Sequence, residues 1–136
     1  MGPQAHDPFA ARLGIAVEVE GPGRARASAV VSEWVTNQHG TAHGGFVYTL
    51  ADAAFAAASN SHGPRAVALV TAMHYVAAPP PGSRLVALAE EEHLGRRTAL
   101  YRIPVRTEDG RLVALFTGTV FRVAEDSDQK AGERAR

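Results

Sequence analysis

The sequence NQHGTAHGGFVYTLADAAFAAASN, residues 37–60, determines which fold is expected. Its first part is polar and rich in glycine, which is typical of a loop. Residues 43–60 contain no proline and are dominated by alanine, the strongest helix former. Asn60 begins the sequence NSHGP, whose residues end helices. The stretch therefore predicts a loop followed by one long helix over about residues 43–60.

The predicted helix carries few polar side chains. Between Phe46 and Ser59 only Tyr48, Thr49 and Asp52 are polar. A helix that is apolar nearly all round is normally buried, and an unpaired carboxylate is costly to bury. Asp52 is therefore either a functional acid in a poorly hydrated place or an acid on the one exposed stripe of the helix. The residues themselves leave both interpretations open.

The loop supplies a second candidate for chemistry because it ends in Gly44 and Gly45 at the helix start. Backbone N–H groups there lack an intrahelical acceptor, and the helix dipole is positive. Such a terminus can stabilise a carbonyl oxygen as it becomes an oxyanion, and glycine allows close approach. The same pair can also merely relieve crowding where the chain enters the core.

A distance argument connects the two candidates. Gly44 and Asp52 are eight residues apart, which is about 12 Å along a helix axis. A carboxylate acting on a carbonyl must come within about 3.5 Å of it. If both residues are catalytic, two antiparallel copies of the helix must share the site. This predicts that a homodimer is the minimal active unit.

The rest of the chain predicts an antiparallel sheet. A short helix is expected from Asp7 to Gly14, because aspartate suits an N-cap and glycine a C-terminal stop. Apolar alternation and turn residues predict six strands: about 15–20, 24–31, 66–75, 84–93, 97–106 and 112–122. Two strands, a long helix and four more strands predict one α+β domain over residues 1–123. Its curved sheet would wrap around the central helix.

Several local features carry further expectations. Pro104 inside a predicted strand indicates an edge position or a bulge. Strand 66–75 is apolar on both faces, which suits coverage on both sides or burial at a subunit contact. The run Glu90–Glu92 is interpreted as a solvated strand end. Residues 124–136 are charged, lack an apolar anchor and are expected to form a disordered tail.

Composition excludes several classes of protein. The 136 residues fit one domain, and 46% are hydrophobic, enough for a core. The formal net charge is zero, so there is no bulk electrostatic footprint for nucleic acid or anionic membrane. The chain has no cysteine, which rules out disulfides and thiolate nucleophiles. No signal peptide or spanning segment is recognisable, so a cytoplasmic location is expected.

Four motifs in this order resemble a known family. They are NxHGTxHGG over residues 37–45, LAD over 50–52, GRRT over 95–98 and ALFTG over 114–118. The combination resembles the phenylacetate-degradation (PaaI-type) branch of the hotdog-fold acyl-CoA thioesterases. The resemblance implies hydrolysis of aryl-acetyl-CoA thioesters of phenylacetyl or hydroxyphenylacetyl type. It also implies no metal or organic cofactor, and tetramers built from paired dimers.

The resemblance also assigns roles to residues. Asp52 matches the catalytic carboxylate, acting as nucleophile or general base, and the Gly44 N–H would polarise the thioester carbonyl. Asn37 and His43 would position the thioester or water from the partner subunit. The expected substrate contacts are Gly45, Arg96, Arg97 and, more weakly, Arg65. Members often carry a helper serine or threonine after the acid or on the next strand. Ala53 follows Asp52 here, and the strand reads Val67-Ala68-Leu69-Val70-Thr71, so no helper is assigned.

Other interpretations stay open at this point. His39 and His43 have a metal-pair spacing but no third ligand. Arg96 and Arg97 can belong to a solvated turn rather than a phosphate contact. A hotdog dehydratase would pair a histidine with an acid on a different loop pattern. A non-catalytic acyl-CoA sensor would not need Asp52 but would usually carry an added DNA-binding helix pair, which is absent from the sequence.

Overall fold

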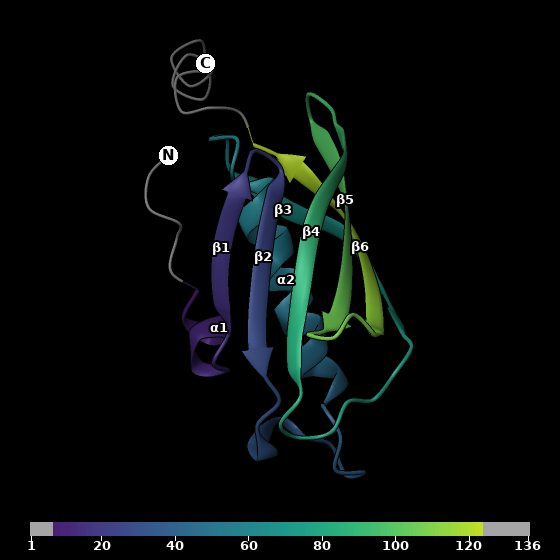
Figure 1. Cartoon of the computed structure of the whole chain (residues 1–136). Coiled ribbons are helices and arrows are strands. Elements are labelled where there is room, and N and C mark those ends of the chain that lie inside the picture. Colours follow the sequence, from purple (N-terminus) through teal and green to yellow (C-terminus); the bar gives the residue numbers. More distant parts are fainter. Residues whose placement is uncertain (1–6, 124–136) are drawn as a thin grey trace.

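One curved sheet wraps around one long helix in the computed structural model, which describes residues 7–123 (Figure 1). The predicted tail, 124–136, lies outside the described residues. The six strands pair antiparallel in the order β1-β2-β4-β5-β6-β3. They are β1 (Ala16–Gly21), β2 (Arg24–Val30), β3 (Ala66–Tyr75), β4 (Arg84–Leu94), β5 (Thr98–Thr107) and β6 (Leu112–Arg122). The α+β prediction is confirmed.

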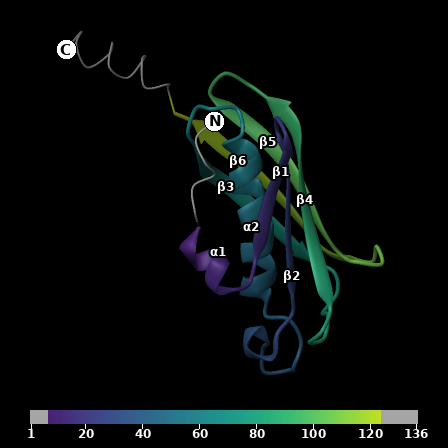
Figure 2. The ribbon, with the colours of Figure 1, turned by 60° about the vertical axis from the view of Figure 1, so that its left-hand side comes forward.

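Three helices complete the fold: α1 (Pro8–Arg12), the 3-10 helix η1 (Glu33–Val35) and α2 (Gly44–Ser59). The α2 bounds agree with the prediction, with His43 and Asn60 as its caps. The Asp7 Oδ1 atom accepts the Ala10 N–H at 3.0 Å and so caps α1 as expected. Figure 2 shows α1 lying beside α2, on the side that the sheet leaves open. The helix η1 was not predicted.

The core forms between α2 and the concave face of the sheet. The Phe55 ring meets the rings of Tyr101 and Phe116 at centroid distances of 5.8 and 5.3 Å. Gly118 of β6 makes this contact possible, because a Cβ there would lie 2.7 Å from the Phe55 ring. The packing fixes the rotation of α2 about its axis, and therefore which residues of α2 face away from the sheet.

Strands that follow one another in the sequence are not all neighbours in the sheet. β3 pairs only with β6, and β4 pairs with β2 and β5, so residues 76–83 cross between separate parts of the sheet. The edge position predicted for Pro104 is wrong, since β5 is a central strand and Pro104 pairs with Leu115. A register irregularity follows directly between Val105 and Arg106, and such bulges accommodate a residue that lacks an N–H.

Strand β3 forms one edge of the sheet and is largely open to solvent within one chain. Val67, Leu69 and Val70 are 45%, 58% and 63% exposed. Coverage of both faces of β3 within one chain, one of the two expectations, is therefore wrong. The other, burial at a subunit contact, stays a prediction. A long apolar edge strand left unpaired is a ready template for pairing with another chain.

Glu91 corrects the interpretation of residues 90–92 as a solvated strand end. Its Oε2 atom accepts the Tyr101 hydroxyl at 2.7 Å and lies 2.6 Å from the His62 Nε2. Burial opposes ionisation, but the hydrogen bonds from Tyr101 and His62 hold the pKa of Glu91 below its ordinary value. This half-buried cluster ties the end of α2 to the centre of the sheet.

Candidate active site

The start of α2 is capped by a histidine side chain. His43 has extended backbone angles, φ −64° and ψ 136°, and its Nδ1 atom accepts the Gly45 N–H at 2.8 Å. A Cβ at Gly45 would lie 3.0 Å from this Nδ1 atom, so glycine leaves room for the cap. Because an accepting nitrogen carries no proton, the neutral ring is protonated at Nε2. His43 therefore presents a hydrogen-bond donor at its outer nitrogen.

The Gly44 N–H is left without a partner in this first turn. The N–H groups of Phe46 and Val47 both donate to the His43 carbonyl oxygen, at 3.0 and 3.1 Å. Gly45 donates to His43 Nδ1, so its amide is already occupied. The Gly44 N–H has no acceptor anywhere in residues 7–123. It therefore combines a free donor with the positive end of the helix dipole.

Asn37 organises the loop that leads into this turn. Its Oδ1 atom accepts the N–H groups of His39 and Thr41 at 2.9 and 3.2 Å, and the Thr41 hydroxyl at 3.3 Å. Two amides pointing at one atom identify that atom as the oxygen, which leaves the side-chain NH₂ as the group that can reach a ligand. The Ala42 N–H donates to the Pro79 carbonyl at 2.9 Å and anchors the loop.

Asp52 lies farther along α2 and is half-buried. Burial, and secondarily the negative charge of Asp7, raises the pKa of Asp52 above its ordinary value. Within residues 7–123 its carboxylate takes part in no hydrogen bond or ion pair, unlike the other half-buried acid, Glu91. Asp52 is therefore a partly desolvated acid with no structural role that its contacts explain, which is typical of functional carboxylates.

The open side of α2 consists of small residues around Asp52. Gly45, Thr49, Asp52 and Ala56 follow one another at helical spacing on this side, and Gly44 and Tyr48 are the other residues of α2 that are partly accessible. Asp52 therefore lies on a partly accessible stripe of α2, as one interpretation expected, and its role as a functional acid stays a prediction. Gly44 and Asp52 remain about 12 Å apart along the axis of one helix, so a single chain does not bring them together.

A pair of hydroxyl groups links α2 to β3, a contact that the sequence did not predict. Tyr48, one turn before Asp52, shares a short hydrogen bond with Thr71 of β3. Thr71 is half-buried and faces α2 across the edge of the sheet. It is the one serine or threonine of β3, and a helper role for it stays unassigned.

The predicted arginines gather at the opposite end of the molecule. The Arg97 carbonyl accepts the Arg122 N–H at 2.7 Å, and the Arg65 carbonyl accepts the Val123 N–H at 2.7 Å. These bonds place Arg65 and Arg97 on either side of the end of β6, and Arg65, Arg96 and Arg97 are all exposed and in no ion pair within the described residues. Figure 1 shows the β4–β5 turn that carries Arg96 and Arg97 at the end where α2 terminates.

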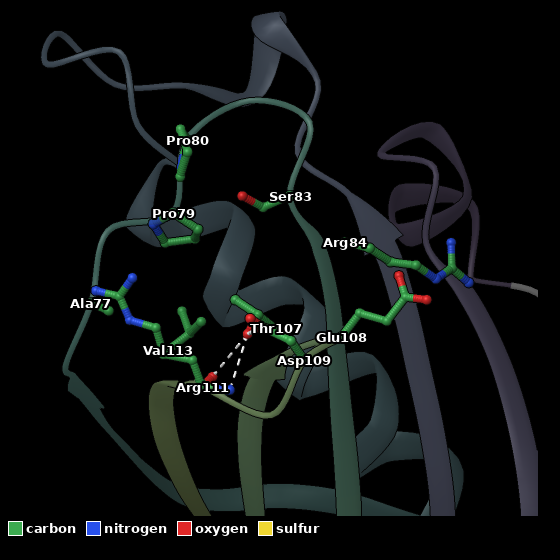
Figure 3. A pocket seen from close by; sticks show the side chains of 10 residues that line it. All are labelled: Ala77, Pro79, Pro80, Ser83, Arg84, Thr107, Glu108, Asp109, Arg111 and Val113. Carbon is green, nitrogen blue, oxygen red and sulfur yellow. Dashed lines mark hydrogen bonds between the residues drawn. The ribbon is translucent and has the colours of Figure 1, made fainter.

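Two hollows lie near the start of α2. The first, which we call the Trp34 groove, has a volume of about 550 Å³ and is lined by residues of α1, η1, α2 and β3, including His43 and Gly45. The second, about 340 Å³, lies between the β3–β4 connection and the β5–β6 turn (Figure 3). Arg84, Glu108 and Arg111 contribute mixed charges to its wall. None of the predicted site residues lines this second hollow.

No three His, Asp or Glu side chains within residues 7–123 are placed to hold a metal ion together. The helices of this range include none long and apolar enough to cross a membrane.

Known proteins share this arrangement. The family model of the thioesterase superfamily matches residues 39–114. The Escherichia coli acyl-coenzyme A thioesterase PaaI is 35% identical over 118 residues, which cover 87% of this chain and 84% of that protein. The structure of a mutant of the Thermus thermophilus phenylacetic acid degradation protein PaaI is 53% identical, with a TM-score of 0.82, over 86% of this chain and 100% of that chain.

A more distant structure contains a ligand. The Streptococcus mutans protein bound to acetyl CoA is 27% identical, with a TM-score of 0.77, over 82% of this chain and 90% of that chain. The fold indicates the same family as the matched family model and the named relatives. The chain belongs to the thioesterase superfamily, as a hotdog-fold hydrolase of the PaaI type of acyl-CoA thioesterases.

Proposed function

We propose that this protein hydrolyses aryl-acetyl-CoA thioesters, of phenylacetyl or hydroxyphenylacetyl type, to the free acid and CoA. Asp52 of one subunit acts on a thioester carbonyl whose oxygen accepts the Gly44 N–H of the partner subunit. The Thermus thermophilus and Escherichia coli PaaI relatives and the acetyl-CoA-bound relative support this substrate class. No metal or organic cofactor takes part in the proposed reaction.

One observation carries the proposal: a free amide and an unpaired acid lie on the same helix but cannot meet within one chain. The Gly44 N–H has no acceptor in residues 7–123, and the Asp52 carboxylate has no partner there. Antiparallel contact between two copies of α2 would place each Asp52 beside the other chain's Gly44. The small residues Gly45 and Ala56 permit close helix approach, and the open edge of β3 can extend the sheet.

The reaction then follows from the chemistry of these groups. In one route Asp52 removes a proton from water, whose oxygen attacks the carbonyl carbon. In the other, an Asp52 oxygen attacks directly and gives an anhydride that water later hydrolyses. Either way the carbonyl oxygen gains negative charge beside the Gly44 N–H, the C–S bond breaks, and the thiolate of CoA leaves and takes up a proton. His43 Nε2–H and the Asn37 NH₂ supply further donors for the thioester or water.

The proposed assembly is a dimer as the minimal active unit, and two dimers as a tetramer. Analytical ultracentrifugation tests it directly. A stable monomer that turns over substrate would contradict the shared site.

The function is tested by measuring CoA release with a thiol reagent. The chain contains no cysteine, so every thiol detected comes from the substrate. Phenylacetyl-CoA and hydroxyphenylacetyl-CoA are expected to turn over faster than acetyl-CoA. Tight binding of these esters without thiol release would contradict the proposal and favour a non-catalytic acyl-CoA sensor.

The cluster of Arg65, Arg96 and Arg97 is proposed to bind the CoA phosphates. Replacing both Arg96 and Arg97 with alanine is expected to raise KM for phenylacetyl-CoA about tenfold with little change in kcat. The reason is that a phosphate far from the carbonyl is bound equally in the ground and transition states. Steady-state kinetics measure this change, and a pantetheine thioester without the nucleotide should be hydrolysed equally by wild type and variant.

The matched control is Arg111→Ala in the second hollow (Figure 3). If this variant raises KM while the Arg96/Arg97 double variant does not, the nucleotide lies in that hollow and the assignment is wrong.

The charge of Asp7 gives a second expected result. This charge contributes to the raised pKa of Asp52, after burial. Asp7→Asn keeps an oxygen that can cap α1 but removes the charge, so the pKa of Asp52 should fall. The acid side of the pH profile of kcat/KM should then move to lower pH, and the move should shrink at high salt. An unchanged profile at low salt would contradict the coupling.

A further inference from the structure

The walls of the Trp34 groove are aromatic and come from four separate elements. They are Phe9 of α1, Trp34 of η1, Phe46 and Tyr48 of α2, and Tyr75 of β3. Its volume of about 550 Å³ lies within the usual range for small-molecule sites. Phe9 and Trp34 are 62% and 66% exposed. Trp34 also lines a neighbouring hollow of about 400 Å³, whose other walls include residues of α1 and β2. Large aromatic side chains left this open indicate a surface that a ligand or partner covers.

Three hydroxyl groups of the groove have already used their protons. Thr36 donates to the Glu33 carbonyl at 2.7 Å, Thr49 to the Gly45 carbonyl at 2.7 Å, and Tyr75 to the Gly44 carbonyl at 2.9 Å. Each oxygen can still accept a hydrogen bond but cannot donate one. None of the described residues that line the groove is Lys, Arg, Asp or Glu. A carboxylate placed here would lose its hydration without gaining a Lys or Arg partner. The imidazole in the described wall, His43, is assigned to the thioester carbonyl or water.

The groove begins at the proposed oxyanion donor. His43 and Gly45, which flank Gly44, are both part of its wall. Tyr75 closes the other side, because a Cβ on Gly44 would lie 3.4 Å from the Tyr75 ring. A carbonyl whose oxygen accepts the Gly44 N–H can therefore direct its acyl substituent along the groove. Arg65, Arg96 and Arg97 lie at the opposite end of the molecule from this wall.

We propose that the Trp34 groove binds the acyl group of the substrate and selects uncharged, apolar acyl groups large enough to reach Trp34. The inference rests on the proposed thioesterase function and adds the residues that set its specificity. A phenylacetyl ring would pack between Phe9 and Trp34, and a ring hydroxyl could donate to the threonine and tyrosine oxygens. Acyl groups that end in a carboxylate would be rejected.

Fluorescence tests the groove without any need for turnover. Trp34 is the single tryptophan of the chain, so intrinsic emission reports on this position alone. Titrating the full-length Asp52→Asn protein with phenylacetyl-CoA should change the emission, whereas CoA and succinyl-CoA should change it far less. Unchanged emission at phenylacetyl-CoA concentrations that saturate wild-type turnover would overturn the proposal.

Steady-state kinetics provide a second test of the groove. Trp34→Ala should lower kcat/KM for phenylacetyl-CoA about tenfold or more, because apolar contact is lost. Acetyl-CoA, which does not reach Trp34, should be affected little. Trp34→Phe should restore most of the phenylacetyl activity. Leu100→Ala, which trims a 42% exposed residue on the outer face of the sheet, should change neither substrate.

Three results separate the competing explanations. An equal loss for acetyl-CoA and phenylacetyl-CoA in Trp34→Ala would overturn the inference and leave the thioesterase function standing. Dissociation of the dimer in Trp34→Ala, but not in Trp34→Phe, would mean that the partner chain fills the groove, which also overturns it. A fluorescence response to phenylacetyl-CoA in a wild-type protein that releases no CoA would uphold the groove and contradict the proposed function.

Discussion

Asp52→Asn is expected to lower kcat for phenylacetyl-CoA by about a thousandfold while leaving the protein folded, a loss typical of removing a general base or nucleophile. The amide has nearly the same shape as the carboxyl group but can neither accept a proton from water nor attack the carbonyl. Binding of the substrate should be little changed, because the acid acts in the transition state. Thiol release and a binding titration on the same samples measure the two effects separately.

Stability provides the control for this variant. The carboxylate of Asp52 is half-buried and unpaired among the described residues, so replacing it with a neutral amide should leave the melting temperature unchanged or raise it. Because burial raises the pKa of Asp52 in the folded state, the carboxyl group contributes stability at low pH that is lost as pH rises through that pKa. The advantage of Asp52→Asn in thermal denaturation should therefore grow as the pH is raised.

The pH profile of the wild type should report the same group. A protonated carboxyl group cannot act as base or nucleophile, so kcat/KM should fall on the acid side through the raised pKa of Asp52. The midpoint should lie above the ordinary range for aspartate. Turnover in Asp52→Asn equal to that of wild type would remove this residue from the mechanism.

Gly44→Pro should lower kcat by about a hundredfold to a thousandfold, the usual effect of removing one oxyanion donor. The substitution deletes the N–H that lacks an acceptor within residues 7–123. The backbone can accept it, because Gly44 is the first residue of α2, a position that proline favours. His43, with φ −64° and ψ 136°, already has the extended conformation required before proline.

Gly44→Ala is the matched control, since it adds a Cβ but keeps the N–H. That Cβ would lie 3.4 Å from the Tyr75 ring, an ordinary contact, so the variant should retain most of its activity. Circular dichroism should show both variants folded. Equal activity of the proline and alanine variants would show that the Gly44 N–H is not the oxyanion donor.

Mixing the two inactive chains tests whether the site is shared. A hybrid of Asp52→Asn and Gly44→Pro subunits contains one site with both defects and one site with neither. If each site takes Asp52 from one chain and Gly44 from the other, activity should return toward half that of wild type. The measurement needs verified subunit exchange, for example by mass spectrometry. Verified hybrids without recovered activity would contradict the two-chain geometry.

The sequence by itself determined the helix, the strands and the local parts of the candidate site. The bounds of α2 follow from neighbouring residues alone: a glycine pair, a histidine cap, an alanine run and the breakers after Asn60. The loop residue Asn37, the cap residue His43 and the helix residues Gly44 and Asp52 could be placed for the same reason. Their relation depends only on helix geometry, which is also why the 12 Å separation could be anticipated.

The tertiary structure decided which partners these residues have. Periodicity reports that a residue is buried but not what it is buried against, so the solvated state of Glu91 was wrong. Of the two alternatives for Pro104, the edge position was wrong, and the register irregularity after Val105 agrees with the other, a bulge. Contacts between residues distant in sequence placed Thr71 against Tyr48 and brought Arg65 to Arg97 through their β6 partners. The Trp34 groove also arises this way, because its walls come from four elements that only the packed chain brings together.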